Sequence, residues 1–398
     1  WDIESDTSTG GGADEISGGA DNIIIGGAGG DIITLGAGFN TVLGDDGIVN
    51  RSDAETITRV ATAGTAGARD EITSEGGTNI ILGGLGDDLI DAAEGSNVVL
   101  GDNGTANFGF GGSWDIESDT STGGGADEIS GGADNIILGG FGADAITLGG
   151  GANTVLGDNG TVERGAGDVV TRVLTGDESG DTGADDVIEL TGGTNIVLGG
   201  MGSDVIDAPG GVNIVLGDNG EVNVGGDVFS TQPDEGGDDV ITAGSNNVIL
   251  GGFGADEFTL GCGTNTVLGD NGVVQRTGGV LQGVHTTDLD DSTGGDDSIT
   301  SLGGVNILIG GVGADFIDAA AGTNIILGDN GSVDADGNVT SDDTTPGGDD
   351  TIFGGVVLGG LTLLSAPAGE ASNIIIGGFG GDDITLGSGI NVVLGDEG

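Results

Sequence analysis

The stretch Gly-Gly-Leu-Gly-Asp-Asp-Leu-Ile-Asp at residues 83–91 decides the fold, because its pattern recurs every nine residues. The glycines permit a tight turn, Asp88 follows that turn, and the apolar Ile90 stands two places further on. A similar polar residue lies nine positions before Asp88, at Asn79, and nine positions after it, at Asn97. Such a nine-residue unit predicts a parallel β-roll, a solenoid with about 18 residues per turn and one short strand on each of two sheets.

The nonapeptides form seven modules of four strands, which open with Asp, Asn, Asp and Asn in turn. Each module ends in Leu-Gly-Asp, followed by Asn, Asp or Glu and then Gly, which we call the junction motif. Residues 1–24 recur unchanged at 114–137, an offset of 113 residues that indicates duplication. We expect one continuous solenoid, and a segment of a longer protein, with modules at 1–47, 48–104, 105–160, 161–220, 221–272, 273–331 and 332–398.

Irregular spacers follow the junction motifs. In residues 160–170 and 331–339, valines alternate with polar residues around a Gly turn, which favours a small antiparallel hairpin over a surface loop. The last module carries its insertion elsewhere, at residues 354–371. We therefore expect an all-β fold with hairpin or loop spacers after each two-turn module.

The strands that open with Asn (the Asn strands) are apolar on both faces. In Asn79-Ile80-Ile81-Leu82 the inner residue is Ile81, so Ile80 and Leu82 face outward. The strands that open with Asp (the Asp strands) carry more polar outer residues, such as Thr73. A strand that is apolar on both faces requires cover. Either the spacers or a second chain cover the Asn-strand sheet, or an apolar stripe is exposed and available for self-association.

The charge of the chain is extreme. Its 398 residues include 66 acidic and 6 basic side chains, a net charge of −60. Such a chain repels itself and is a poor partner for nucleic acid or for an anionic membrane. No apolar run reaches the length of a transmembrane segment, so we expect no membrane insertion. The regular apolar strands argue against disorder, and the alternative is that cations neutralise the acids within the fold.

The nonapeptides resemble the RTX, haemolysin-type repeat, whose pattern is G-G-x-G-x-D-x-U-x with U a large apolar residue. Close matches are residues 83–91, 199–207 and 310–318. The resemblance implies Ca²⁺ between stacked turns, secretion, and folding outside the cell. The chain departs from the pattern at every second unit, where Asn replaces Asp. There we favour a metal-free ladder of stacked Asn side chains, and the alternative is weaker calcium binding through amide oxygens.

The candidate metal ligands are carboxylates that follow glycine turns, because Ca²⁺ prefers hard oxygen ligands. All of them are expected on one edge of the solenoid. The residues that open the Asp strands are Asp14, Asp31, Asp70, Asp88, Asp127, Asp144, Asp186, Asp204, Asp239, Asp256, Asp297, Asp315, Asp350 and Asp382. Those of the junction motifs are Asp45, Asp102, Asp158, Asp218, Asp270, Asp329 and Asp396.

The chain contains few of the residue types that commonly act in catalysis. The chain has one His, one Cys and no Tyr, and it lacks zinc-protease and nucleophile-elbow motifs. We expect no enzyme activity in this segment. We expect a calcium-binding structural segment of a secreted bacterial cell-surface protein, forming a rod, filament, surface layer or adhesin stalk. The alternative is a secretion and folding block attached to a toxin or hydrolase domain outside this segment.

Overall fold

The structure is a computed structural model with strands and no helices among the residues that it describes. These are residues 2–5, 10–53, 56–92, 94–109, 112–121, 123–167, 169–176, 183–288, 292–319, 322–341, 347–354, 372–387 and 389–395. The chain divides into two compact units, Trp1–Met201 and Gly202–Gly398. No helix in the described part is long and apolar enough to span a membrane.

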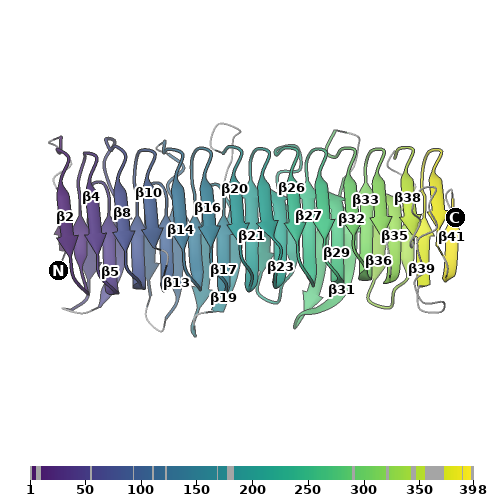
Figure 1. Ribbon diagram of the computed structural model, residues 1–398, viewed down its shortest axis with the longest axis horizontal. Coiled ribbons are helices and arrows are strands. Elements are labelled where there is room, and N and C mark those ends of the chain that lie inside the picture. Colours follow the sequence, from purple (N-terminus) through teal and green to yellow (C-terminus); the bar gives the residue numbers. More distant parts are fainter. Residues whose placement is uncertain are drawn as a thin grey trace. The chain divides into compact units, whose positions relative to one another are not determined.

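The Asp strands of each unit form one parallel sheet, the Asp-strand sheet (Figure 1). In the first unit it contains β2 (Glu15–Gly18), β4 (Ile32–Leu35), β8 (Glu71–Ser74), β10 (Leu89–Ala92), β14 (Glu128–Gly131), β16 (Ala145–Leu148) and β20 (Val187–Leu190). In the second unit it contains β22 (Val205–Ala208), β26 (Val240–Ala243), β28 (Glu257–Leu260), β32 (Ser298–Ser301), β34 (Phe316–Ala319), β38 (Thr351–Gly354) and β40 (Asp383–Leu386).

The Asn strands form the second parallel sheet, the Asn-strand sheet. In the first unit it contains β3 (Ile23–Ile25), β5 (Gly38–Leu43), β9 (Gly77–Leu82), β11 (Ser96–Leu100), β15 (Asn135–Leu138), β17 (Ala152–Leu156) and β21 (Thr194–Gly200). In the second unit it contains β23 (Val212–Asp218), β27 (Asn247–Gly252), β29 (Gly263–Asp270), β33 (Gly304–Gly311), β35 (Gly322–Asp329), β39 (Ser372–Ile376) and β41 (Ile390–Leu394).

The spacers form a third, antiparallel sheet, which we call the hairpin sheet. In the first unit it contains β1 (Asp2–Glu4), β6 (Gly47–Arg51), β7 (Ile57–Thr62), β12 (Gly104–Phe108), β13 (Trp114–Ser118), β18 (Gly160–Gly165) and β19 (Val169–Thr175). In the second unit it contains β24 (Gly220–Asn223), β25 (Val228–Ser230), β30 (Gly272–Thr277), β31 (Val280–Thr286), β36 (Gly331–Asp334) and β37 (Val339–Ser341). The predicted hairpins are confirmed, except that residues 355–371 of the last insertion lie outside the described residues.

The parallel register places equivalent residues of successive strands side by side. Asn97 pairs with Asn79 on one side and with Asn135 on the other, and Ile72 pairs with Ile90. The inward-facing residues of both sheets, such as Ile72 and Ile90, are completely buried between them. The nine-residue step therefore fixes the register, because any shift would expose the apolar row.

The Asn side chains stack into a hydrogen-bonded ladder along one edge. Asn79 Nδ2 donates to Asn97 Oδ1 at 2.7 Å, and Asn97 Nδ2 donates to Asn135 Oδ1 at 2.9 Å. The same bond joins Asn213 to Asn247 in the second unit. These side chains are buried, and each amide both donates and accepts, so the row satisfies itself. The predicted stacking of Asn side chains is confirmed.

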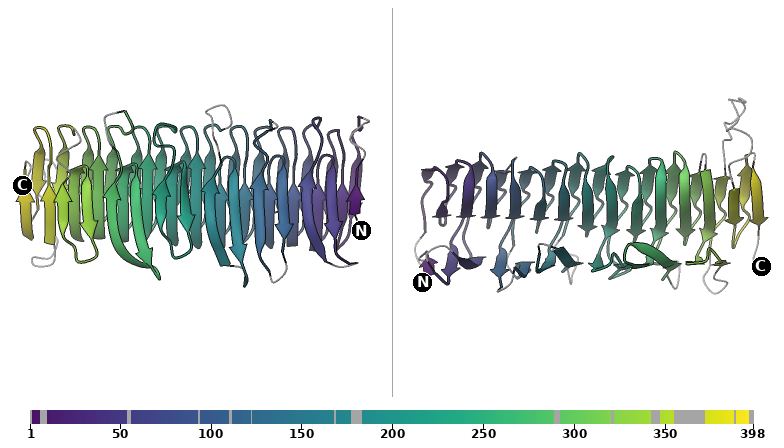
Figure 2. Two further views of the ribbon diagram at one scale, coloured as in Figure 1. Left: turned by 180° about the vertical axis from the view of Figure 1, so that it is seen from behind. Right: turned by 90° about the horizontal axis from the view of Figure 1, so that it is seen from below.

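The hairpin sheet packs against the outer face of the Asn-strand sheet within each unit (Figure 2). Leu43, Leu82 and Leu100 point outward from their strands and are buried beneath it, together with Val49 and Ile116 of the hairpins. The apolar outer face that the sequence predicts for the Asn strands is therefore largely covered by the chain's own spacers. Gly47 opens β6 directly against Leu43, where a side chain would collide with the leucine.

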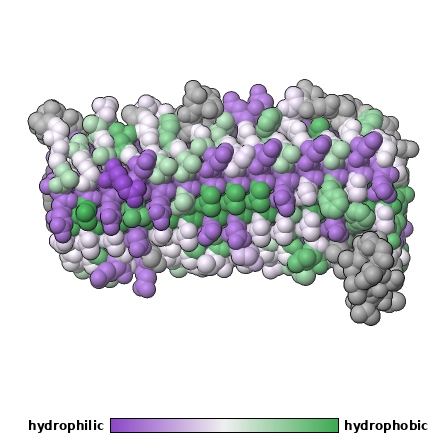
Figure 3. Space-filling model, turned by 45° about the horizontal axis from the view of Figure 1, so that its top comes forward, coloured by the Kyte–Doolittle hydropathy of each residue, from purple (hydrophilic) through white to green (hydrophobic). Residues whose placement is uncertain are grey.

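Among the described residues, none forms a comparable layer over the outer face of the Asp-strand sheet. Its side chains are mostly polar, with apolar residues among them, as Figure 3 shows. In the first unit Ile32 and Val187 are 48% and 44% exposed, and in the second unit Phe316 is 39% exposed. In the second unit Val205 and Val240 are paired on neighbouring strands and are 43% and 42% exposed, so they form a short apolar row within this face.

The Asn ladder predicts a localised loss of stability in Asn97→Ala. This change leaves the Nδ2 of Asn79 and the Oδ1 of Asn135 buried without their ladder partner, at a cost of about 2 to 4 kcal/mol. Urea unfolding monitored by circular dichroism measures it, and Ser96→Ala, at an exposed neighbouring position, serves as the matched control. Equal midpoints for the two variants would contradict a stabilising role of the ladder.

Candidate metal centre

The residues that open the Asp strands form an Asp ladder along the edge where the chain passes from an Asn strand to an Asp strand. The backbone N–H of Asp70 donates to Asp88 Oδ1 at 2.7 Å, and that of Asp88 donates to Asp127 Oδ1 at 2.7 Å. In the second unit the N–H of Asp239 donates to Asp256 Oδ1 at 2.8 Å. Asp88, Asp127 and Asp256 therefore each use one carboxyl oxygen to bind the backbone of the preceding turn.

The second carboxyl oxygen of many ladder residues, Oδ2, differs from Oδ1 in having no hydrogen-bond donor. Oδ2 is buried and accepts no hydrogen bond in Asp31, Asp70, Asp88, Asp127, Asp144, Asp239, Asp256, Asp297, Asp315 and Asp350. A buried acceptor without a donor costs about 1 to 3 kcal/mol, and more when it is charged. A row of such oxygens in one chemical position needs a neutralising group, either a proton or a cation.

Glycine backbone surrounds these oxygens. A methyl group on Gly83 would collide with Oδ2 of Asp88 and with the carbonyl oxygen of Gly101 in the next turn. Gly251 stands in the same relation to Asp256 and to the carbonyl of Gly269. Carboxylate and carbonyl oxygens of successive turns therefore face the same space, and they are the ligand types that calcium prefers.

Burial also changes the acidity of the ladder. Desolvation raises the pKa of Asp70 to about 8 and that of Asp88 to about 9, and neighbouring ladder carboxylates add to both shifts. In the second unit the pKa values of Asp239 and Asp297 are also raised well above the usual range, and desolvation is again the main cause. The row cannot carry full negative charge in this geometry unless something neutralises it.

The junction aspartates are bound differently. Gly125 N–H donates to Asp102 Oδ1 at 3.0 Å and Phe141 N–H donates to Oδ2 at 2.5 Å. The first donor lies where the chain re-enters the solenoid after the spacer, and the second lies in the following turn. Asp158, Asp218, Asp270 and Asp329 accept equivalent pairs of N–H groups. Each of these five junction carboxylates thus acts as a clasp that holds the two ends of its spacer.

The structure brings both sets of predicted residues to one edge. Within the ladder, Asp14 is exposed and Asp382 is half-buried, and the others are buried. In the first junction motif, Asp45 Oδ2 accepts the N–H of Leu85 at 2.6 Å. Asp396 lies outside the described residues. Desolvation raises the pKa of Asp45 to about 7 and that of Asp102 to about 8.

One further row of acidic residues was not predicted from the sequence. Asp87, Asp238, Asp296 and Asp349 stand immediately before ladder residues, and each accepts the N–H of a residue in the next turn. The double acid in Asp87-Asp88 is the sequence signal for this row. These side chains are more exposed than the ladder, so they brace the turns at the solvent side.

The donor set fits a cation shared between turns better than an isolated metal cage. Among the described residues, no group of three or more acidic, His or Cys side chains could hold a metal ion. A cation at this edge would take single carboxylate oxygens from turns about 4.8 Å apart, completed by backbone carbonyls. Searches against protein-family models, curated proteins and solved structures find no match to this chain.

The raised pKa values predict that, without divalent cations, the fold is more stable in acid than in alkali. The ladder carboxyls have an ordinary pKa of 3.8 and folded values of about 8 for Asp70 and about 9 for Asp88. Their stabilising contribution is therefore fully present below the ordinary value and is lost as the pH rises through the folded values. Circular dichroism in chelator between about pH 5 and pH 9 tests the trend; a β-sheet signal that strengthens toward alkaline pH would contradict it.

Proposed function

We propose that this chain is a calcium-stabilised structural segment of a secreted cell-surface protein, of the RTX type that its repeats resemble. The observation that carries the proposal is the row of buried Oδ2 atoms without hydrogen-bond partners on a chain of net charge −60. Such a row needs neutralising, and glycine turns place carbonyl oxygens beside it. A rod, filament, surface layer or stalk is built from many similar modules, and the modules of this chain are similar to one another.

The ladder residues would hold the ions. Oδ2 of Asp88 faces the carbonyl of Gly101, and each following turn repeats the arrangement, so that one ion can take oxygens from two turns. A bound Ca²⁺ supplies positive charge that offsets the repulsion along the row. Oδ1 meanwhile keeps each side chain fixed on the N–H of the preceding turn. The junction aspartates would serve mainly as spacer clasps, because both oxygens of Asp102 already accept N–H groups.

Calcium would then act as a folding switch. At neutral pH without calcium, folding would require ladder groups such as Asp88 to bury charge or to take up protons, and both oppose folding. Calcium that binds the folded form alone stabilises it by mass action. Millimolar calcium is typical of sites in extracellular modules. We therefore place the folded protein outside the cell, with the chain exported before its solenoid forms.

Association between copies is a separate part of the proposal. In the second unit, Val212 and Val305 face outward from the Asn-strand sheet and are 44% and 53% exposed. They mark the apolar parts of this face that the hairpins leave open, and they would support contacts with a second copy. The net charge opposes close approach, so such contacts would be favoured at high calcium and high ionic strength.

Removal of calcium tests the proposed function. At neutral pH we expect the β-sheet circular dichroism to be strong in millimolar calcium and to be lost in EDTA, and to return when calcium is restored. Magnesium should restore less structure, because it demands a rigid octahedral set of ligands and keeps its water. An unchanged spectrum in EDTA at neutral pH would contradict the proposal.

Two substitutions distinguish the role of the ladder aspartates from that of the junction aspartates. Asp88→Asn keeps a side-chain acceptor for Asp70 N–H but removes a buried charge, so it should lower the number of bound calcium ions while stabilising the calcium-free fold. Asp102→Asn leaves one buried N–H without an acceptor and should destabilise by about 1 to 3 kcal/mol at every calcium concentration. Equilibrium dialysis and urea unfolding measure the two effects; identical behaviour of both variants would refute this division of roles.

A further inference from the structure

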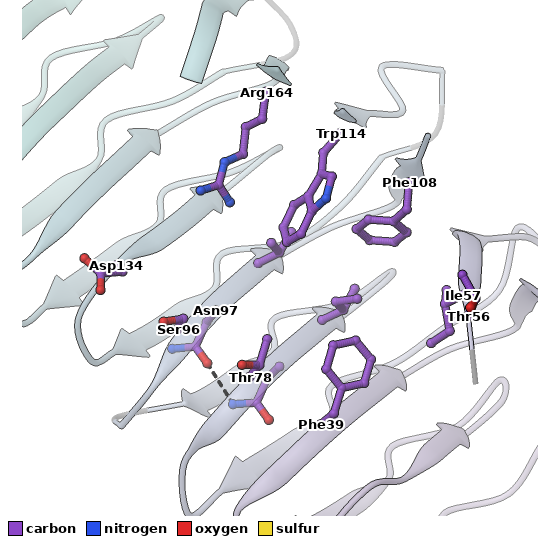
Figure 4. A pocket seen from close by; sticks show the side chains of 13 residues that line it. Phe39, Thr56, Ile57, Thr78, Ser96, Asn97, Phe108, Trp114, Asp134 and Arg164 are labelled. Atoms are coloured by element: carbon purple, nitrogen blue, oxygen red, sulfur yellow. Dashed lines mark hydrogen bonds between the residues drawn. The ribbon is translucent and has the colours of Figure 1, made fainter. Parts of the chain in front are cut away.

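A hollow opens between the hairpin sheet and the Asn-strand sheet of the first unit (Figure 4). Its volume is 320 Å³, within the size range of small-molecule sites. One wall comes from the hairpin tips, with Ile57, Phe108 and Trp114, and the other comes from the start of the Asn strands, with Phe39 and Thr78. The hollow is independent of the Asp ladder, which lies on the opposite edge.

The geometry of the spacers explains why the hollow exists. The hairpins start at the junction motifs, where Gly47 and Gly104 press against Leu43 and Leu100. Toward the other edge the hairpin tips rest over residues that precede the Asn ladder. Several of these are small and exposed, such as Thr78 and Ser96, so the two layers do not fill the space between them.

Aromatic side chains gather there to an unusual degree. The chain has 12 aromatic residues (10 Phe and 2 Trp), and three of them line this hollow. Phe108 and Trp114 meet edge to face with ring centroids 5.1 Å apart, and Arg164 stacks over the indole at 4.8 Å. Phe39 stands on the opposite wall and is 44% exposed, so an apolar surface faces solvent inside a concave site.

The polar lining restricts the ligand. Hydroxyl groups of Thr78 and Ser96 and the opposite charges of Arg164 and Asp134 border the aromatic surface. The net charge of −60 repels anions, and the charges of Arg164 and Asp134 offset each other within the lining. A neutral ligand with an apolar face and several hydroxyl groups matches both the rings and the polar rim.

The hollow also continues along the stack of strands. A second hollow of 690 Å³ shares Thr78, Ser96, Trp114, Asp134 and Arg164 with the first and extends to Thr154 and Ile196. Together they form a groove that crosses several strands beneath the hairpin tips. A groove of this kind suits a linear polymer better than a single compact molecule.

From this lining we infer that the groove of the first unit is a binding site for a neutral oligosaccharide. The pyranose faces would lie against Phe39 and Trp114, and the sugar hydroxyls would exchange hydrogen bonds with Thr78, Ser96 and Asp134. Arg164 would act as a positioning residue that holds the indole in place by stacking on it.

Calorimetric titration of the calcium-loaded chain with maltohexaose, cellohexaose and N-acetylchitohexaose tests the inference. We expect at least one of the three to bind saturably, and hexagalacturonate, which is acidic, to bind much more weakly. Phe39→Ala should weaken binding about tenfold, as expected for the loss of an aromatic contact. Thr78→Val should weaken it less, because it removes one hydroxyl group and keeps the shape.

Phe316→Ala in the second unit is the matched control, since Phe316 is 39% exposed and lies outside the groove. It should leave the affinity unchanged. Failure of all three neutral sugars to bind, tighter binding of hexagalacturonate, or equal affinities of Phe39→Ala and Phe316→Ala would each overturn the inference. Circular dichroism of Phe39→Ala in calcium verifies that a loss of binding does not come from unfolding.

Discussion

The fold depends on how a column of buried carboxyl groups is neutralised. The buried Asp residues of the ladder, such as Asp88 and Asp127, bind the backbone of the preceding turn through Oδ1, so they cannot leave the interior without releasing that turn. Desolvation and its ladder neighbours then raise the pKa of Asp88 to about 9. The same contact that aligns the turns therefore concentrates negative charge. A proton or a cation at Oδ2 resolves the conflict, and the proton can do so only below the raised pKa values of about 8 for Asp70 and about 9 for Asp88.

The two edges of the solenoid differ in how their stacked polar side chains are satisfied. Both stack a polar side chain at every turn. On one edge the amide of Asn97 accepts from Asn79 and donates to Asn135, so the row is neutral and complete. On the other edge a carboxylate can only accept hydrogen bonds, and its second oxygen has no donor. Alternation of Asn and Asp thus gives one edge whose hydrogen bonds are complete and one edge that, as we propose, is neutralised by protons or cations.

Much of this could be predicted from the sequence. The nine-residue step fixes strands, register and inward residues such as Ile90, and Val alternation identifies the hairpins. The different roles of Asp88 and Asp102 could not be predicted, because in sequence both are simply acids close behind glycines. Their difference arises from distant N–H groups, such as that of Phe141, which only the stacked structure brings near. The groove was also missed, since it depends on where hairpin tips come to rest over Phe39.

Neutralisation of the ladder is tested by a count of the protons that are released when calcium binds at mildly acidic pH. Under those conditions the calcium-free fold holds ladder groups such as Asp70 in the protonated form, since burial raises their pKa to about 8. Titration calorimetry in two buffers of different ionisation enthalpy gives the number of protons per ion. We expect calcium to displace protons from the folded chain. Calcium binding without proton release, or no binding to the acid-folded chain, would contradict it.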